Sequence, residues 1–175
     1  MKSCSGKISW WLQGCGLVIL ALSLTAAAPK GEAVHFKQLI PFVEVKIPGY
    51  QMEDKPTGAT VKHEGIQMSE ARAAFHSGDK RLEIHIMDFW GQTMPFLAGM
   101  PQVDMESSAE RLKTTQVQGF KALETFRPQE KEGELSISVA DRFWVKIDGD
   151  GIDNPESLHS AAKAMDLKKL AELAK

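Results

Sequence analysis

Histidine and carboxylate side chains are the residues of this sequence that could bind a metal ion or exchange protons. The five histidines are scattered and form no closely spaced pair of the kind that binds zinc on one helix face: His35, His63, His76, His85 and His159. His76 and His85 share one face of a predicted hairpin, with Glu83 beside them. Arg72 and Arg81 are expected directly opposite these histidines. Two cations oppose metal binding, so we predict no metal site.

The acidic stretch from Asp148 to Asp153 is similar to a calcium-binding loop, but its spacing does not match. If Asp148 and Asp150 are the first and third ligands, Ile152 occupies the position of the fifth ligand, and the glycine comes two positions early. An acidic turn that leads into a capped helix explains the same residues.

Motifs for nucleophilic or phosphate chemistry are missing from the sequence. It has no Gly-x-Ser-x-Gly elbow, no phosphate-binding glycine loop and no dinucleotide fingerprint. Ser69 is expected opposite Asp88, which favours a structural hydrogen bond over part of a catalytic triad. Met94, Met100 and Met105 are soft donors for copper, but their spacing and the lack of a companion histidine favour core methionines. We therefore assign no catalytic residue and no cofactor.

The best-defined element is a hairpin over residues 66–90, turning at Gly78-Asp79. A two-residue turn there puts the apolar side chains on one face, with Phe75 opposite Leu82, Ala73 opposite Ile84 and Ala71 opposite Ile86. The other face then pairs Arg72 with His85, Ala74 with Glu83 and His76 with Arg81. A slip of one residue would put charge into the core, so this register is well specified.

Residues 1–27 have the layout of a secretory signal peptide, in which two lysines precede an apolar run at 8–24 and small residues follow. We predict cleavage after Ala27, followed by a tether at 28–35. The alternative is an uncleaved anchor, because residues 8–24 are just long enough to span a thin bilayer. Cys15 ends a lipoprotein-like box, but the most apolar residues follow it, which argues against acylation.

Charge and cysteine content narrow the function classes further. Both cysteines, Cys4 and Cys15, lie in the predicted signal, so the mature chain has no disulfide and no thiol chemistry. Cleavage would also remove Lys2 and Lys7, which changes the formal net charge from −2 to −4. An acidic chain offers no basic field for nucleic acid or anionic lipid. We expect a periplasmic or secreted protein that meets a membrane only through residues 8–24, if these are retained.

The rest of the chain predicts more strands and a C-terminal helix. We expect a helical turn at 36–40 before Pro41, strand-like chain at 50–62 with a loop at 55–58, and strands at 111–117 and 120–127. A further hairpin at 134–147 pairs Val139 with Phe143, but its loop then ends in Arg142, where glycine or asparagine is usual, so this register stays open. A helix begins near Asn154. Residues 36–175 are thus predicted to be one α+β domain with a mainly antiparallel sheet of about six to eight strands, packed against a C-terminal helix and short helices.

Residues 89–105 have an unusual composition, because apolar side chains crowd there without regular alternation. Pro95 suits the start of a short helix and Pro101 its end. One interpretation is a helix that caps the open end of the sheet and completes the core. The other is an adaptable binding surface rich in methionine and aromatic residues. Its contact residues would be Trp90, Met94, Phe96 and Met100.

A resemblance rests on three motifs, which are Ser69-Glu70-Ala71-Arg72 followed by Phe75, Gly78-Asp79 before Asp88, and Asp141-Arg142-Phe143. This pattern resembles a group of small secreted bacterial proteins without an assigned function, over most of the mature chain. Helices packed on an antiparallel sheet are also similar to the fold of the photosystem accessory protein PsbP and the Ran-binding protein Mog1. That similarity implies a binding or accessory role and no functional residues.

Two functions therefore stay open. The first is a non-catalytic binding or accessory protein of the bacterial envelope that holds an unknown envelope protein or an apolar ligand near residues 89–105. The second is a small, hydrolase-like periplasmic enzyme that uses Arg72, His85 and Asp88 at the polar edge of the sheet. An enzyme should bring at least three polar residues together in a concave pocket, whereas a binding protein should show an apolar patch or groove.

Overall fold

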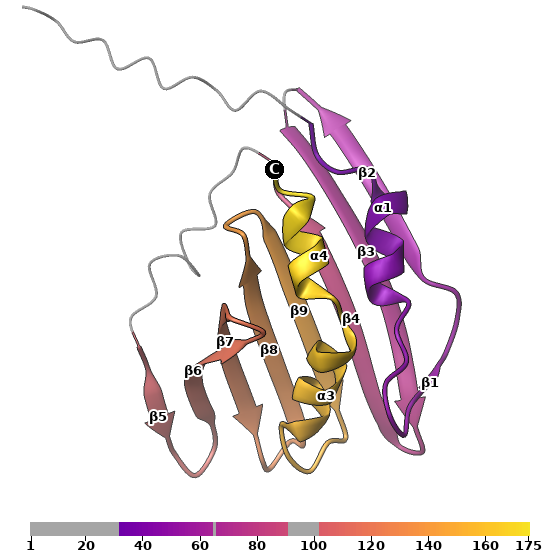
Figure 1. Cartoon of the computed structure of the whole chain (residues 1–175). Helices are drawn as coiled ribbons and strands as arrows, with labels where there is room; N and C mark the ends of the chain where they lie inside the picture. The colour runs from indigo at the N-terminus through magenta and orange to yellow at the C-terminus, as the bar shows by residue number, and fades with distance from the viewer. Residues whose placement is uncertain (1–31, 65, 91–101) are drawn as a thin grey trace, which may run out of the picture.

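The computed structural model describes residues 32–64, 66–90 and 102–175, except for the side chain of Ile66. Within these residues it has nine strands and three helices (Figure 1). The strands are β1 (Gln51–Met52), β2 (Thr57–His63), β3 (Ile66–Ser77), β4 (Lys80–Asp88), β5 (Asp104–Glu106), β6 (Arg111–Val117), β7 (Phe120–Arg127), β8 (Glu132–Val139) and β9 (Phe143–Asp150). The helices are α1 (Phe36–Val43), α3 (Glu156–Ala164) and α4 (Leu167–Glu172).

All the strands belong to one antiparallel sheet in the order β1-β3-β4-β9-β8-β7-β6-β5, and β2 pairs with β3 beside β1. The predicted α+β class with a mainly antiparallel sheet is confirmed. The strand count is higher than predicted, because the short strands β1 and β5 also join the sheet.

The three helices cover the same face of the sheet, with α1 over β3 and the C-terminal helices over β8 and β9 (Figure 1). We call this the helix face and the opposite one the open face. Alternate residues of the central strands send their apolar side chains to the helix face, where those of β9 are buried at Phe143, Val145 and Ile147. Gly133 and Gly149, which lie opposite each other, let α3 approach closely. A Cβ atom at either glycine would lie 3.0 Å from a methyl carbon of Leu158 in α3.

The register predicted for the central hairpin is confirmed at all six pairs named above. Gly78 has a φ of +60°, the left-handed conformation that glycine adopts at low cost in a two-residue hairpin turn. The apolar row of this hairpin is almost fully buried, with exposed fractions between 0 and 4 %. Burial of that row is what fixes the register.

The hairpin β8–β9 settles the register that the sequence left open. Val139 does pair with Phe143. The left-handed residues of the loop are its first two, Ala140 (φ 54°) and Asp141 (φ 52°), and Arg142 has no positive φ. The Arg142 side chain can therefore point back over the helix face without backbone strain at its own position.

Strands β6 and β7 have the predicted bounds, and a left-handed turn at Gln118-Gly119 joins them. The Gln118 amide Nε2 donates to the carbonyl oxygens of Ala162 (2.9 Å) and Met165 (2.7 Å) at the end of α3. The Ala162 carbonyl also accepts the Met165 N–H at 3.3 Å, so the turn of one hairpin adds to the cap of a helix that follows far along the chain. The sequence did not predict this contact.

Helix α1 is longer than predicted, because it continues through Pro41 to Val43. The proline removes a backbone donor, but continuing the helix buries Phe42 and Val43 against the sheet. The chain also forms two C-terminal helices in place of one. They meet at Asp166, whose carboxylate accepts the Lys169 N–H at 2.9 Å and caps α4.

Three smaller predictions need correction or completion. Thr57 and Gly58, predicted in a loop, belong to β2, since its pairing with β3 extends to them. Residues 104 and 105, predicted as the end of the apolar segment, lie in β5, in which Met105 is 44 % exposed. Ala33 is buried and its N–H donates to Gln67 Oε1 (3.1 Å), so the last residues of the predicted tether lie against the domain.

Replacing Ala73 by arginine tests the two faces of the sheet. Ala73 is 4 % exposed on the helix face, so a buried guanidinium should cost at least about 3 kcal/mol of unfolding free energy in urea denaturation. The matched control is Ala74→Arg, which places the same side chain on the open face opposite Glu83. This control should change stability by no more than about 0.5 kcal/mol. Equal losses in the two variants would contradict the assigned faces.

Candidate functional site

The open face carries its polar side chains in bands that cross neighbouring strands. One band runs from Arg72 through His85 to Lys146 and is rich in cations. The next band contains three carboxylates that lie directly opposite one another on adjacent strands, namely Glu83, Asp148 and Glu134. Like charges placed opposite one another repel, so the two bands stabilise each other by pairing.

Arg72 and His85, two of the three residues nominated for a polar site, do lie together. Arg72 Nε is 3.2 Å from His85 Nε2, and Glu70 Oε2 is 3.0 Å from Arg72 Nη2 and 3.2 Å from His85 Nε2. Burial and the Arg72 charge lower the pKa of His85, so its neutral form is favoured at pH 7. Burial alone would raise the pKa of Glu70, but Arg72 and His85 outweigh it and the pKa is lowered. This is a carboxylate held by two neighbours, without an adjacent nucleophile.

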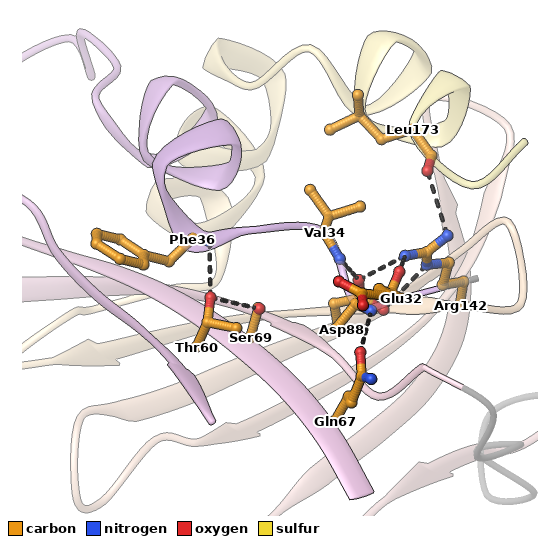
Figure 2. Close-up of polar contacts among 10 residues, drawn as sticks. Glu32, Val34, Phe36, Thr60, Gln67, Ser69, Asp88, Arg142 and Leu173 are labelled. Atoms are coloured by element: carbon orange, nitrogen blue, oxygen red, sulfur yellow. Dashed lines mark hydrogen bonds and ion pairs between the residues drawn. The ribbon is translucent and has the colours of Figure 1, made fainter. Parts of the chain in front are cut away.

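Asp88, the third nominated residue, lies on the helix face, and its side chain is fully buried. Arg142 binds it with two hydrogen bonds, from Nε to Oδ1 (3.0 Å) and from Nη2 to Oδ2 (2.8 Å). The Val34 N–H also donates to Oδ2 at 2.7 Å (Figure 2). The sheet therefore separates Asp88 from Arg72 and His85, and the three residues do not converge.

The Arg142 guanidinium has further partners from the first and the last described segments of the chain (Figure 2). It donates to the carbonyl oxygens of Glu32 (3.1 Å) and Leu173 (3.3 Å). Its Cζ atom lies 4.1 Å from the centre of the Trp90 ring, within the range of a cation–π contact. We call Asp88, Arg142 and these partners the buried arginine cluster. Arg142 was noted in the sequence for its place in a loop and in the motif Asp141-Arg142-Phe143, because nothing local marks it as the partner of Asp88.

Ser69 lies opposite Asp88, as predicted, but it takes a different hydrogen-bond partner. The Ser69 and Thr60 hydroxyl oxygens are 2.8 Å apart, and Thr60 also accepts the Phe36 N–H at 3.0 Å. These bonds hold the start of α1 against β2 and β3. They give Ser69 a structural role, as expected, although not through Asp88.

A hollow of about 290 Å³ opens on the open face over β4, β9, β8 and β7. Its lining includes the three carboxylates of the acidic band, with Arg81 and Arg127 among the other charged residues. Burial raises the pKa of Asp148, and the charges of Glu134 and Glu83 add to this effect against the opposing Lys146. Lys146 Nζ lies 2.8 Å from Asp148 and 3.4 Å from Glu134. Among the described residues, no group of three histidine or acidic side chains is arranged to hold a metal ion.

The end of the open face nearest residue 89 is more apolar than the charged bands of that face. Phe89 and Trp144 lie close together, with ring centres 6.5 Å apart, and Met87 pairs with Trp144 across β4 and β9. The Trp144 Nε1–H donates to Ser136 Oγ at 3.2 Å, which fixes the indole on the sheet. Of the predicted binding residues, Trp90 is half-buried against Arg142. Met94, Phe96 and Met100 lie outside the described residues.

The helix face has a separate groove between α1 and α4, with a volume of about 560 Å³. Pro41, Phe42, Val45 and Leu173 form much of its wall, and charged side chains such as Glu44 and Asp166 also line it. The groove is partly apolar, but Glu44 after α1, Asp166 before α4 and Lys169 within α4 also line it.

No family model, curated protein or solved structure matches this chain. None of the helices in the described part of the chain is long and apolar enough to cross a membrane. The resemblances stated from the sequence therefore stay predictions.

Asp88→Asn tests whether the buried ion pair supports the fold. The variant leaves the Arg142 charge without its counterion at an 11 % exposed position, which should cost about 3 to 5 kcal/mol in chemical denaturation. Asp153→Asn is the control, because Asp153 pairs with Lys80 and Lys131 on the surface, where ion pairs contribute little. A variant of Asp88 as stable as the control variant would show that the pair is not needed.

The carboxyl titration of Asp148 tests the electrostatics of the acidic band. A raised folded-state pKa means that the folded protein binds its proton more tightly than the unfolded chain does. Ionisation of Asp148 therefore lowers stability as pH rises from the ordinary aspartate range through the raised pKa. NMR should show its midpoint above the ordinary aspartate value of 3.8, and Glu134→Gln should move it down. The distant Glu64→Gln should have no effect, and an Asp148 midpoint below 3.8 would contradict the account.

Proposed function

We propose that this protein is a non-catalytic binding or accessory protein of the bacterial envelope. It holds an apolar partner surface next to Phe89 and Trp144, at the end of the open face where residues 89–105 begin. The observation that carries the proposal is the aromatic contact of Phe89 with Trp144 on a sheet face that none of the described helices covers. A rigid sheet that presents aromatic side chains is suited to binding an apolar partner.

The polar groups support a binding role over catalysis. Every buried side-chain nitrogen or oxygen among the described residues has a hydrogen-bond partner. The strongest polar contacts are committed to structure, since Asp88 is bound by Arg142 and the Val34 N–H. Arg72 and His85 share Glu70 on the other face of the sheet. The hollow on the open face does gather charged groups at a concave position, but these groups are paired, Asp148 and Glu134 with Lys146 and Glu83 with Arg81.

The partner contact also has a defined anchor at its first residues. Phe89 lies against Trp144, while Trp90 lies against Arg142. The chain that leads into Met94, Phe96 and Met100 is thus held at its start by two aromatic contacts. We propose that Trp90 positions this segment and that Phe96 and Met100 contact the partner.

Serine variants of Phe96 and Met100 test the proposal, with the apolar dye anilinonaphthalene sulfonate as the first probe. If these side chains form an exposed apolar surface, each variant should lower the dye fluorescence several-fold and leave the melting temperature nearly unchanged. Ala74→Ser, on the same sheet face, is the control that should retain dye binding. Losses of about 2 to 5 kcal/mol in stability would instead show that the segment completes the core, and would contradict the proposal.

A second measurement identifies the partner. A photoreactive phenylalanine at position 96 should cross-link one envelope component in cells, and Trp144→Ser should weaken that product. The same photoreactive residue at position 74 should not form it. Cross-linking that is equal from both positions would contradict a specific contact.

A further inference from the structure

We infer that β2 is the dimerisation edge of this protein and pairs antiparallel with β2 of a second copy. This inference concerns a different surface from the proposed partner site and does not depend on it. It starts from the two edges of the sheet, which lie at β2 with β1 on one side and at β5 on the other (Figure 1). An unpaired edge offers backbone N–H and C=O groups to another strand.

The two edges differ in how well they are protected against pairing with a strand of another molecule. Strand β5 has only three residues, and short length is one form of edge protection. Strand β2 pairs with β3 through seven consecutive residues, without a bulge and without proline. Its one cation, Lys62, is already paired with Glu32. Short length, bulges and prolines are usual protections of an edge, and β2 lacks these three; Lys62 is its one lysine.

The exposed side chains of β2 support pairing. Val61 is 49 % exposed, and it is one of two exposed large hydrophobic residues among the described ones. Its register opposite Met68 places it on the open face, together with Ala59. The other exposed large hydrophobic residue, Met105, lies on β5. The longer edge strand, β2, thus carries an apolar side chain, Val61, that is exposed to solvent in the monomer.

A second copy is the occupant that fits β2 best, because the strand is complementary to itself. With a two-fold axis at Thr60, Ala59 of each copy faces Val61 of the other, so both exposed valines are covered. Lys62 then faces Gly58, and His63 faces Thr57. No two like charges lie opposite each other in this register.

The symmetry of the contact also favours this pair. Joining β2 to β5 of another copy would be a head-to-tail contact that continues into fibres, whereas β2 with β2 closes after two copies. A seven-residue strand pair is small for an interface, so the dimer should be weak and depend on concentration.

Sedimentation velocity over a concentration series tests the inference on the chain as cells produce it. The weight-average mass should rise towards twice that of one chain. Val61→Lys places two cations diagonally across the strand pair and should raise the concentration needed for dimers at least about tenfold. Met105→Lys is the matched control on the other edge and should dimerise as the unchanged protein does. Circular dichroism should show both variants folded.

Hydrogen exchange gives a readout that needs no variant. Alternate backbone N–H groups of β2 point away from β3, and these should exchange more slowly as the protein concentration rises. An unchanged protein that stays monomeric and shows no such slowing would overturn the inference. A dimer that survives Val61→Lys unchanged, or is lost in Met105→Lys, would overturn it as well.

Discussion

The ion pair between Asp88 and Arg142 is the interaction on which the rest of this structure depends. Asp88 is the last residue of β4, in the middle of the sheet. Arg142 is the last residue of the loop before the neighbouring strand β9. Through this pair and its neighbours the sheet holds Glu32 and Val34 at the start of the fold and Leu173 at its end. A buried charge pair is stabilising only when its remaining donors and acceptors are satisfied, and here carbonyl and N–H groups of the terminal segments supply those partners. The segment that begins at Glu32 and the end of the C-terminal helices are therefore tied to the core.

The two faces of the sheet differ in what covers them. The helix face is closed by α1, α3 and α4, and polar caps such as Gln118 and Asp166 satisfy the helix ends without opening the core. The open face keeps paired charges and, near residue 89, aromatic side chains. Arg142 connects the buried ion pair with the proposed binding segment, since the same guanidinium that binds Asp88 lies against Trp90. The first residues of the proposed binding segment at 89–105 are thus held against the folded sheet.

Periodicity predicted the parts of the fold that local patterns control. The register of β3–β4 follows from alternation and a glycine turn, and the bounds of β6 and β7 follow from the same signals. The contacts that depend on distant residues could not be predicted. Arg142 lies 54 positions from Asp88 in the chain, and Gln118 lies 44 from Ala162, so no spacing rule connects them. The polar trio failed to converge for a different, local reason, because strand alternation places residues 85 and 88 on opposite faces of β4.

Native-state hydrogen exchange at the Val34 amide tests the central claim most directly. This N–H lies in an irregular segment, but it donates to the buried carboxylate of Asp88 at 2.7 Å. If the buried arginine cluster holds the N-terminal segment in the core, the Val34 amide should exchange only by opening of the sheet, with a protection close to that of the β4 amide of Ile86. Exchange as fast as that of an exposed loop amide would show that the N-terminal segment opens independently, and would contradict the account.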